Sequence, residues 1–123
     1  MKVKYYKCMH CGNIIEKIDD KGVPVICCGE PMQELKAGVT DAAVEKHVPE
    51  VTVDGTVVTA VVGSTIHPMT EEHLIQFICL ETEKGFQIKN LEHTDEPKAV
   101  FCVPEDKPVA VYEYCNLHGL WKK

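Results

Sequence analysis

The sequence predicts an all-β protein in two parts, a small metal-binding module followed by an antiparallel β-sandwich. Four of the seven cysteines lie within the first 28 residues, too densely for an ordinary apolar core. After them, about six short apolar segments alternate with turn signals, as in a sandwich. No stretch shows the sustained period of about 3.6 residues that predicts a helix.

The first module is expected to consist of short strands around a cysteine cluster. Residues 3–7 and 14–18 are apolar enough for strands, residues 19–22 indicate a turn, and residues 23–26 lead into Cys27 and Cys28. Between the first two strands, Cys8 and Cys11 precede Gly12, a spacing that lets backbone N–H groups turn toward the sulfurs. A module of roughly 35 residues cannot bury a sufficient core, so a metal crosslink is the expected stabiliser.

A linker is predicted at residues 35–40, which places the boundary near residue 37 and gives domains 1–37 and 38–123. Residues 51–58 form two strands joined by Asp54-Gly55, a strong hairpin signal. Residues 74–80 and 86–91 flank a second turn, and 98–103 and 109–114 are the last two expected strands. These strands predict an antiparallel sandwich.

Composition excludes several classes of function. The net charge is −6 and arginine is absent, whereas nucleic-acid grooves cluster arginine and lysine, so no nucleic-acid partner is expected. No apolar run approaches the roughly 18 residues that span a bilayer, and the first residues lack the apolar region of a secretory signal. We therefore expect no membrane association, a cytoplasmic location, and cysteines present as thiols or metal ligands.

The first candidate metal site consists of Cys8, Cys11, Cys27 and Cys28. Four thiolates favour tetrahedral zinc or iron. Adjacent side chains diverge, so Cys27 and Cys28 can reach one metal only if the backbone bends. The spacing leaves iron and a purely structural zinc knuckle open, and it makes a redox disulfide of Cys8 with Cys11 the weaker alternative because two thiols would remain.

The second candidate site contains four histidines and a cysteine: His47, His67, His73, Cys115 and His118. Any one of these histidines alone would be read as a surface or core residue, but all five side chains are expected at strand ends or in loops, where distant strands converge. Structural zinc does not need five ligands, and a blue-copper site uses fewer histidines. Five ligands around an octahedral redox metal leave one open position, and a thiolate ligand raises the electron density on the metal. Such a site suits a small oxygen species.

These motifs resemble the desulfoferrodoxins, the two-iron class of superoxide reductase. The resemblance covers essentially the whole chain. It rests on the paired cysteines together with Glu45-Lys46-His47, His67-Pro68-Met69, Glu72-His73 and Cys115-Asn116-Leu117-His118-Gly119. It implies a desulforedoxin-like first domain, an immunoglobulin-like second domain and a homodimer. It also implies mononuclear iron at both sites and an antioxidant reaction in which superoxide becomes hydrogen peroxide without release of dioxygen. A rubredoxin-like one-electron donor would then reduce the iron again.

The resemblance also implies individual roles. The four histidines would be equatorial ligands and Cys115 the axial ligand, with Lys46 attracting the anionic substrate and Glu45 occupying the sixth position of ferric iron. Backbone N–H groups of residues 116–118 would bond to the Cys115 sulfur. Cys79 and Cys102 lie inside predicted strands and are expected to be buried. An iron electron-transfer protein is the alternative function, and a structural zinc protein is a third.

Overall fold

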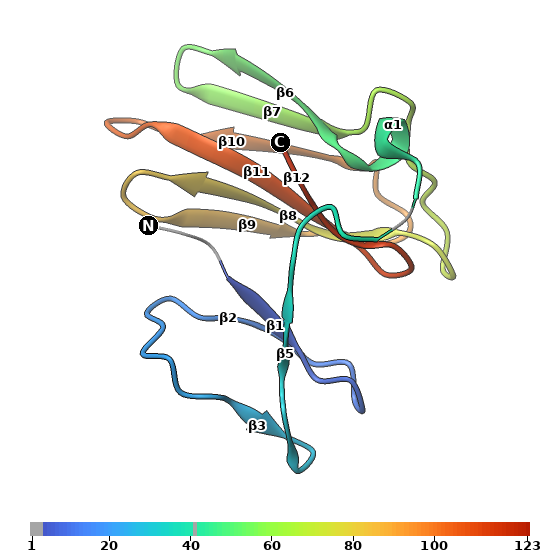
Figure 1. The fold of residues 1–123 in the computed structure, drawn as a ribbon. Coiled ribbons are helices and arrows are strands. Elements are labelled where there is room, and N and C mark those ends of the chain that lie inside the picture. The colour runs from blue at the N-terminus through green and yellow to red at the C-terminus, as the bar shows by residue number, and fades with distance from the viewer. Residues whose placement is uncertain (1–3, 41) are drawn as a thin grey trace. The chain divides into compact units, whose positions relative to one another are not determined.

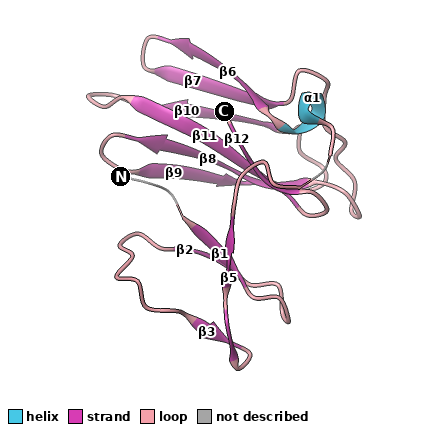
Figure 2. Ribbon diagram, viewed as in Figure 1, coloured by secondary structure: helices cyan, strands magenta, loops and turns pink. Residues whose placement is uncertain are grey.

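The computed structural model describes residues 4–40 and 42–123, and it confirms the all-β prediction. The chain divides into two compact units, a smaller one that ends at Lys36 and a larger one that runs from Ala37 to Lys123. Figures 1 and 2 show both units built from strands, with a short helix in the larger unit. None of the helices in the described residues is long and apolar enough to cross a membrane.

The smaller unit has five short strands. They are β1 (Tyr5–Lys7), β2 (Ile14–Glu16), β3 (Ile26–Cys27), β4 (Glu30–Pro31) and β5 (Gln33–Leu35). One sheet has the order β2-β1-β5, and β3 and β4 form a two-stranded sheet. The strands β4 and β5 were not predicted, because each is too short to show an alternating pattern. Among the described residues of this unit, only Tyr5, Cys8 and Met32 are buried apolar side chains, as the small size of the module predicts.

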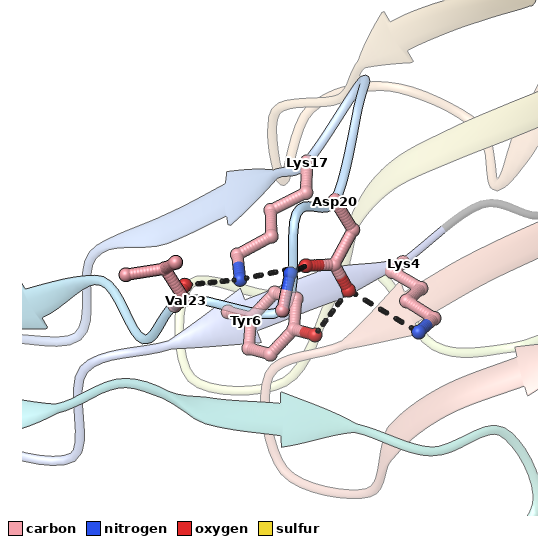
Figure 3. A network of polar contacts seen from close by, with 6 residues as sticks. Lys4, Tyr6, Lys17, Asp20 and Val23 are labelled. Atoms are coloured by element: carbon pink, nitrogen blue, oxygen red, sulfur yellow. Dashed lines mark hydrogen bonds and ion pairs between the residues drawn. The ribbon is translucent and has the colours of Figure 1, made fainter.

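A polar network compensates in part for this thin core (Figure 3). The Asp20 carboxylate accepts hydrogen bonds from Lys4 Nζ at 3.2 Å, Tyr6 Oη at 3.3 Å, Lys17 Nζ at 3.2 Å and the Gly22 amide at 2.9 Å. The amide of Gly22 and the ammonium of Lys17 contribute most to holding the pKa of the Asp20 carboxyl well below its usual range. The network ties the loop that leads to Cys27 back to β1 and β2.

The larger unit is a sandwich of two antiparallel sheets. The strands are β6 (Pro49–Asp54), β7 (Val57–Val62), β8 (Ile75–Thr82), β9 (Phe86–Asn90), β10 (Lys98–Cys102), β11 (Pro108–Cys115) and β12 (Gly119–Lys122). One sheet has the order β10-β7-β6 and the other β12-β11-β8-β9. The two sheets form the two layers of this unit in Figure 1.

Alternation along the strands builds the core between these layers. In β7, Val58, Ala60 and Val62 are buried while their neighbours are more exposed, and Ala99 and Phe101 of β10 follow the same pattern. Each fully buried side chain of the size of valine or phenylalanine contributes about 1.5–3 kcal/mol relative to exposure. The core cluster includes Cys115, so one candidate metal ligand is itself packed in the core of the sandwich.

The structure corrects three details of the prediction. The four-residue helix α1 (Val44–His47) and the strand β12 were missed, because neither is long enough to display a period. The hairpin turn lies one residue later than expected, since Asp54 pairs with Val57 across Gly55 and Thr56. Cys102 is exposed and not buried, because it lies on the outward row of β10, a strand at the edge of its sheet.

Candidate metal centres

The first centre is the tetracysteine site, formed by Cys8, Cys11, Cys27 and Cys28. Their sulfur atoms all lie within 4.8 Å of one another, and the Cys11 and Cys27 sulfurs are 3.6 Å apart. Cys28 adopts a left-handed backbone conformation with φ of 53°. This is the bent backbone expected for adjacent ligands, and it is uncommon for a residue other than glycine.

The environment of this site favours ionisation of the Cys8 thiol and opposes ionisation of the Cys28 thiol. Backbone N–H groups of Cys11 and His10 lower the pKa of the Cys8 thiol to about 6. The neighbouring thiols of Cys11 and Cys8 raise the pKa of Cys28 to about 12. A cation would remove this mutual repulsion by turning all four sulfurs into thiolate ligands. The donor set therefore fits a metal such as iron or zinc.

The second centre is the His/Cys site, in which ligand atoms of His47, His67, His73 and Cys115 lie within 4.8 Å of one another. His47 ends α1, Cys115 ends β11, and His67 and His73 lie in the loop between β7 and β8. Figure 1 shows α1 and these strand ends gathered at one end of the sandwich. His47, His67 and Cys115 are buried, whereas His73 is partly exposed.

Backbone carbonyl groups fix the orientation of two of these rings. Nδ1 of His47 lies 2.7 Å from the Ala43 carbonyl oxygen, and Nδ1 of His67 lies 2.7 Å from that of Pro68. Because a carbonyl oxygen only accepts, both Nδ1 atoms carry the proton and donate it. Each Nε2 is then an unprotonated donor atom for a metal, in the arrangement usual for metal-bound histidines.

The unpaired imidazole nitrogens of the His/Cys site and the burial of its side chains both fit a bound cation. Among the described residues, Nε2 of His67 and Nε2 of His73 are buried without a hydrogen-bond partner. Desolvation is the main cause that lowers the pKa of His47 and His73, and it lowers the pKa of His67 to about 4. The imidazoles are therefore neutral at pH 7, which is the form that binds metals. Partnerless buried nitrogens of this kind are costly unless a ligand satisfies them.

Hydrogen bonds to the Cys115 sulfur agree in part with the expectation. Burial raises the pKa of this thiol, while the backbone N–H groups of Leu117 and His118 bond to the sulfur and act in the opposite direction. The Asn116 amide instead donates to the Leu74 carbonyl at 3.2 Å. Two of the three predicted N–H groups therefore face the sulfur, where they would stabilise a thiolate and tune a bound metal.

His118 lies beside this cluster without belonging to the most compact group. Its Nδ1 is 3.1 Å from Nε2 of His47 and 3.9 Å from the Cys115 sulfur. Its ring contacts those of His47 and His73 edge to face. Trp121 stacks on His47 with ring centroids 5.0 Å apart and donates Nε1–H to the His118 carbonyl. The role of Trp121 in positioning two of the imidazoles was not visible in the sequence.

Glu45 and Lys46 are exposed on α1, directly before His47. Desolvation is the largest cause of the lowered pKa of His47 and His73. The positive charge of the Lys46 ammonium is a further cause that lowers both pKa values. Glu45 acts in the opposite direction on His47. The positive charge of the exposed Lys46 therefore acts electrostatically on two imidazoles of the site.

Glu113 is a buried acid that the sequence analysis missed. It lies on β11 between Val111 and Cys115, whose side chains belong to the core, so alternation alone could have predicted an inward carboxyl. It is 0% exposed, and neither of its carboxyl oxygens has a hydrogen-bond partner among the described residues. Desolvation raises its pKa to about 9.

A Glu113→Gln variant is expected to flatten the dependence of stability on pH. Between the ordinary pKa of 4.5 and the folded value of about 9, the folded chain holds a proton that the unfolded chain releases. Stability therefore falls as pH rises, by up to about 1.4 kcal/mol per pH unit. Urea unfolding at about pH 5 and about pH 8 measures the slope. The exposed Glu50→Gln is the control, and equal slopes in all three proteins would contradict the assignment.

A tetracysteine unit together with a His/Cys site at the end of an antiparallel sandwich defines a two-centre metalloprotein. The family model described as desulfoferrodoxin matches residues 39–123, and that of the desulfoferrodoxin N-terminal domain matches residues 1–35. The chain belongs to the desulfoferrodoxin family.

Relatives and solved structures agree with this assignment. Desulfoferrodoxin of Nitratidesulfovibrio vulgaris is 51% identical over 95% of this chain and 92% of its own length. That of Syntrophotalea carbinolica is 46% identical over 98% of this chain and 94% of its own. The crystal structure of superoxide reductase from Treponema pallidum is similar over 100% of this chain and 99% of that one, with a TM-score of 0.85 and 36% identity.

Proposed function

We propose that this protein is a superoxide reductase, which reduces superoxide to hydrogen peroxide at the His/Cys site without releasing dioxygen. The observation that carries the proposal is a buried thiol and three neutral imidazoles brought together, with the positive charge of Lys46 beside them. An iron ion held there would supply the one electron that each superoxide needs, and two protons from solvent complete hydrogen peroxide. Membership in the desulfoferrodoxin family supports the same reaction.

Hydrogen bonds within the chain set the protonation state and the charge of the candidate ligands for that reaction. Ala43 and Pro68 carbonyls keep the Nε2 atoms of His47 and His67 unprotonated. The N–H groups of Leu117 and His118 stabilise negative charge on the Cys115 sulfur. We assign His118 as a fourth imidazole ligand because its Nδ1 faces the cluster. Glu45, which is exposed on α1 directly before His47, would supply a carboxylate to the oxidised metal.

Lys46 steers the anionic substrate toward the site, against the repulsion of a chain with net charge −6. The Lys46→Ala variant is expected to react with superoxide about tenfold more slowly at low ionic strength, because the attractive local field is lost. The difference should shrink in about 1 M salt, where the Debye length is about 3 Å. Pulse radiolysis across a salt series measures both effects.

Lys21→Ala is the control for Lys46→Ala, since it removes the same charge from an exposed ion pair with Asp19 in the smaller unit. It should change the rate by less than about twofold. A Lys46→Ala rate that equals the wild-type rate at every ionic strength would rule out steering.

The proposed function is tested by metal content per chain together with visible spectra before and after mild reduction. Two irons with two separately bleaching bands, followed by stoichiometric peroxide from superoxide, would support a reductase. Zinc without a visible band would leave a structural protein. An iron protein that exchanges electrons but leaves superoxide unchanged would instead be the electron carrier considered as the alternative.

The remaining assignments are part of the proposal. The units act as domains 1–37 and 38–123, with iron in the tetracysteine site, and the protein is a cytoplasmic homodimer that is reduced by a rubredoxin-like one-electron donor. Support comes from the family and from the donor chemistry of the two sites. Sedimentation of the metal-loaded protein tests the dimer, and stopped-flow reduction by rubredoxin tests the donor.

A further inference from the structure

Gly63 makes a contact that no other residue type could make. An added Cβ atom at this position would lie 2.7 Å from the Glu45 carbonyl oxygen, 2.9 Å from that of Val48 and 3.0 Å from the Lys46 carbonyl carbon. All three are backbone atoms, so no side-chain rotation could relieve the contact. The segment after β7 therefore packs directly against the backbone of α1 and the residue after it.

The other glycines do not share this property. Of the eight glycines, all of which the structure describes, six have a positive φ, and their role is backbone conformation. Gly85 has neither a positive φ nor any atom within 4 Å of an added Cβ. Gly63 alone is required by a close approach to backbone, and the backbone that it approaches carries Glu45 and Lys46.

Hydrogen bonds from the next two residues hold the same peptide. The Glu45 carbonyl oxygen accepts from the Thr65 amide at 2.8 Å and from Ser64 Oγ at 3.3 Å. A four-residue helix with no side-chain cap cannot hold its own position, because its single turn is an unfavourable nucleus. The loop at residues 63–65 therefore holds the Glu45 peptide of α1, while the His47 end is held by its stack with Trp121.

We propose that Gly63 is a positioning residue for the reaction at the His/Cys site, acting through the backbone of α1 to place Glu45 and Lys46. The inference rests on the proposed function and adds a residue that touches neither metal nor substrate. A side chain at position 63 must push α1 outward by some tenths of an ångström. The His47 ring stays packed against Trp121, while the exposed pair before it moves.

The test compares Gly63→Ala with Gly85→Ala in the full metal-loaded chain. Both variants replace one glycine by alanine, but only the first meets backbone. We expect Gly63→Ala to bind both metals, to react with superoxide about tenfold more slowly and to lose salt dependence, as displaced catalytic groups do. Gly85→Ala should match the wild type within about twofold. Equal rates and salt dependence in the two variants would overturn the proposal.

A second readout does not depend on activity. With zinc, a diamagnetic ion, in both sites, amide NMR shifts of residues 45–48 should move in Gly63→Ala and stay in place in Gly85→Ala. Unmoved amides in Gly63→Ala would refute the placement. If the wild type fails to reduce superoxide, the proposed function fails, and the amide shifts still decide whether Gly63 places α1.

A milder variant covers the case in which Gly63→Ala does not bind both metals. Ser64→Ala removes only the hydroxyl that donates to the Glu45 carbonyl. It should shift the Lys46 and His47 amides in the zinc-loaded chain and lower the superoxide rate by about twofold, in line with the modest net contribution of one hydrogen bond. Unchanged amides and an unchanged rate would count against the proposal.

Discussion

The Cys115→Ser variant is expected to lose superoxide reduction by about two orders of magnitude or more, which corresponds to at least about 2.7 kcal/mol of activation free energy. Cys115 supplies the sole sulfur of the His/Cys site, and its side chain is 0% exposed, so solvent cannot replace it. Serine preserves the shape but is a harder and less electron-donating ligand. The visible thiolate band of this centre should disappear as well.

Cys102→Ser is the matched control for Cys115→Ser. It removes an exposed thiol of the same unit, on a strand at the edge of a sheet, and its sulfur makes a weak 3.9 Å contact with Thr56 Oγ1. Pulse radiolysis and visible spectra of both variants give the comparison. A Cys115→Ser protein that keeps its band and its rate would exclude Cys115 as the metal ligand.

The Cys8→Ser variant is expected to lose the metal of the tetracysteine site and, with it, the order of the smaller unit. Cys8 is 2% exposed and is one of only three buried apolar side chains among the described residues of that unit. With so little core, the metal crosslink supplies a large share of the folding free energy. Metal content should fall from two ions to one, and limited proteolysis should cut within the first 36 residues.

The larger unit should remain folded in Cys8→Ser, because its core and its metal ligands lie entirely within residues 37–123. Full superoxide reduction by this variant would show that the first centre does not relay electrons. Met9→Ala, which changes an exposed side chain beside Cys8, should keep both metals. Protease resistance equal to that of the wild type in Cys8→Ser would contradict a metal-dependent fold.

Much of the candidate site could be predicted because its chemistry depends on residue types and spacing. The pair Cys8 and Cys11 and the pair Cys27 and Cys28 indicated a thiolate site, and the structure brings all four sulfurs together. For the second site, the sequence placed the histidines and Cys115 at element ends. The structure brings three histidines and Cys115 into one cluster with His118 beside it.

The details that were missed depend on contacts between distant segments. The β5 strand exists because it pairs with β1, and β12 exists because it pairs with β11; neither has enough residues to show a pattern alone. Helix α1 forms where the loop after β7 binds the Glu45 carbonyl. Cys102 is exposed because its row of β10 faces away from the core. Which face of the strand turns inward is decided by the sheet that packs against it.

By itself, the sequence determined the all-β class, the two groups of candidate metal ligands and the charge beside the second group, since alternation, ligand chemistry and charge belong to individual residues. Tertiary structure alone decided which nitrogen of His47 and His67 faces the site, that the Glu113 carboxyl finds no hydrogen-bond partner among the described residues, and that Gly63 contacts the backbone of α1. The physical reason is that a hydrogen-bond partner, a desolvated carboxyl and a steric contact are properties of two segments brought together by folding.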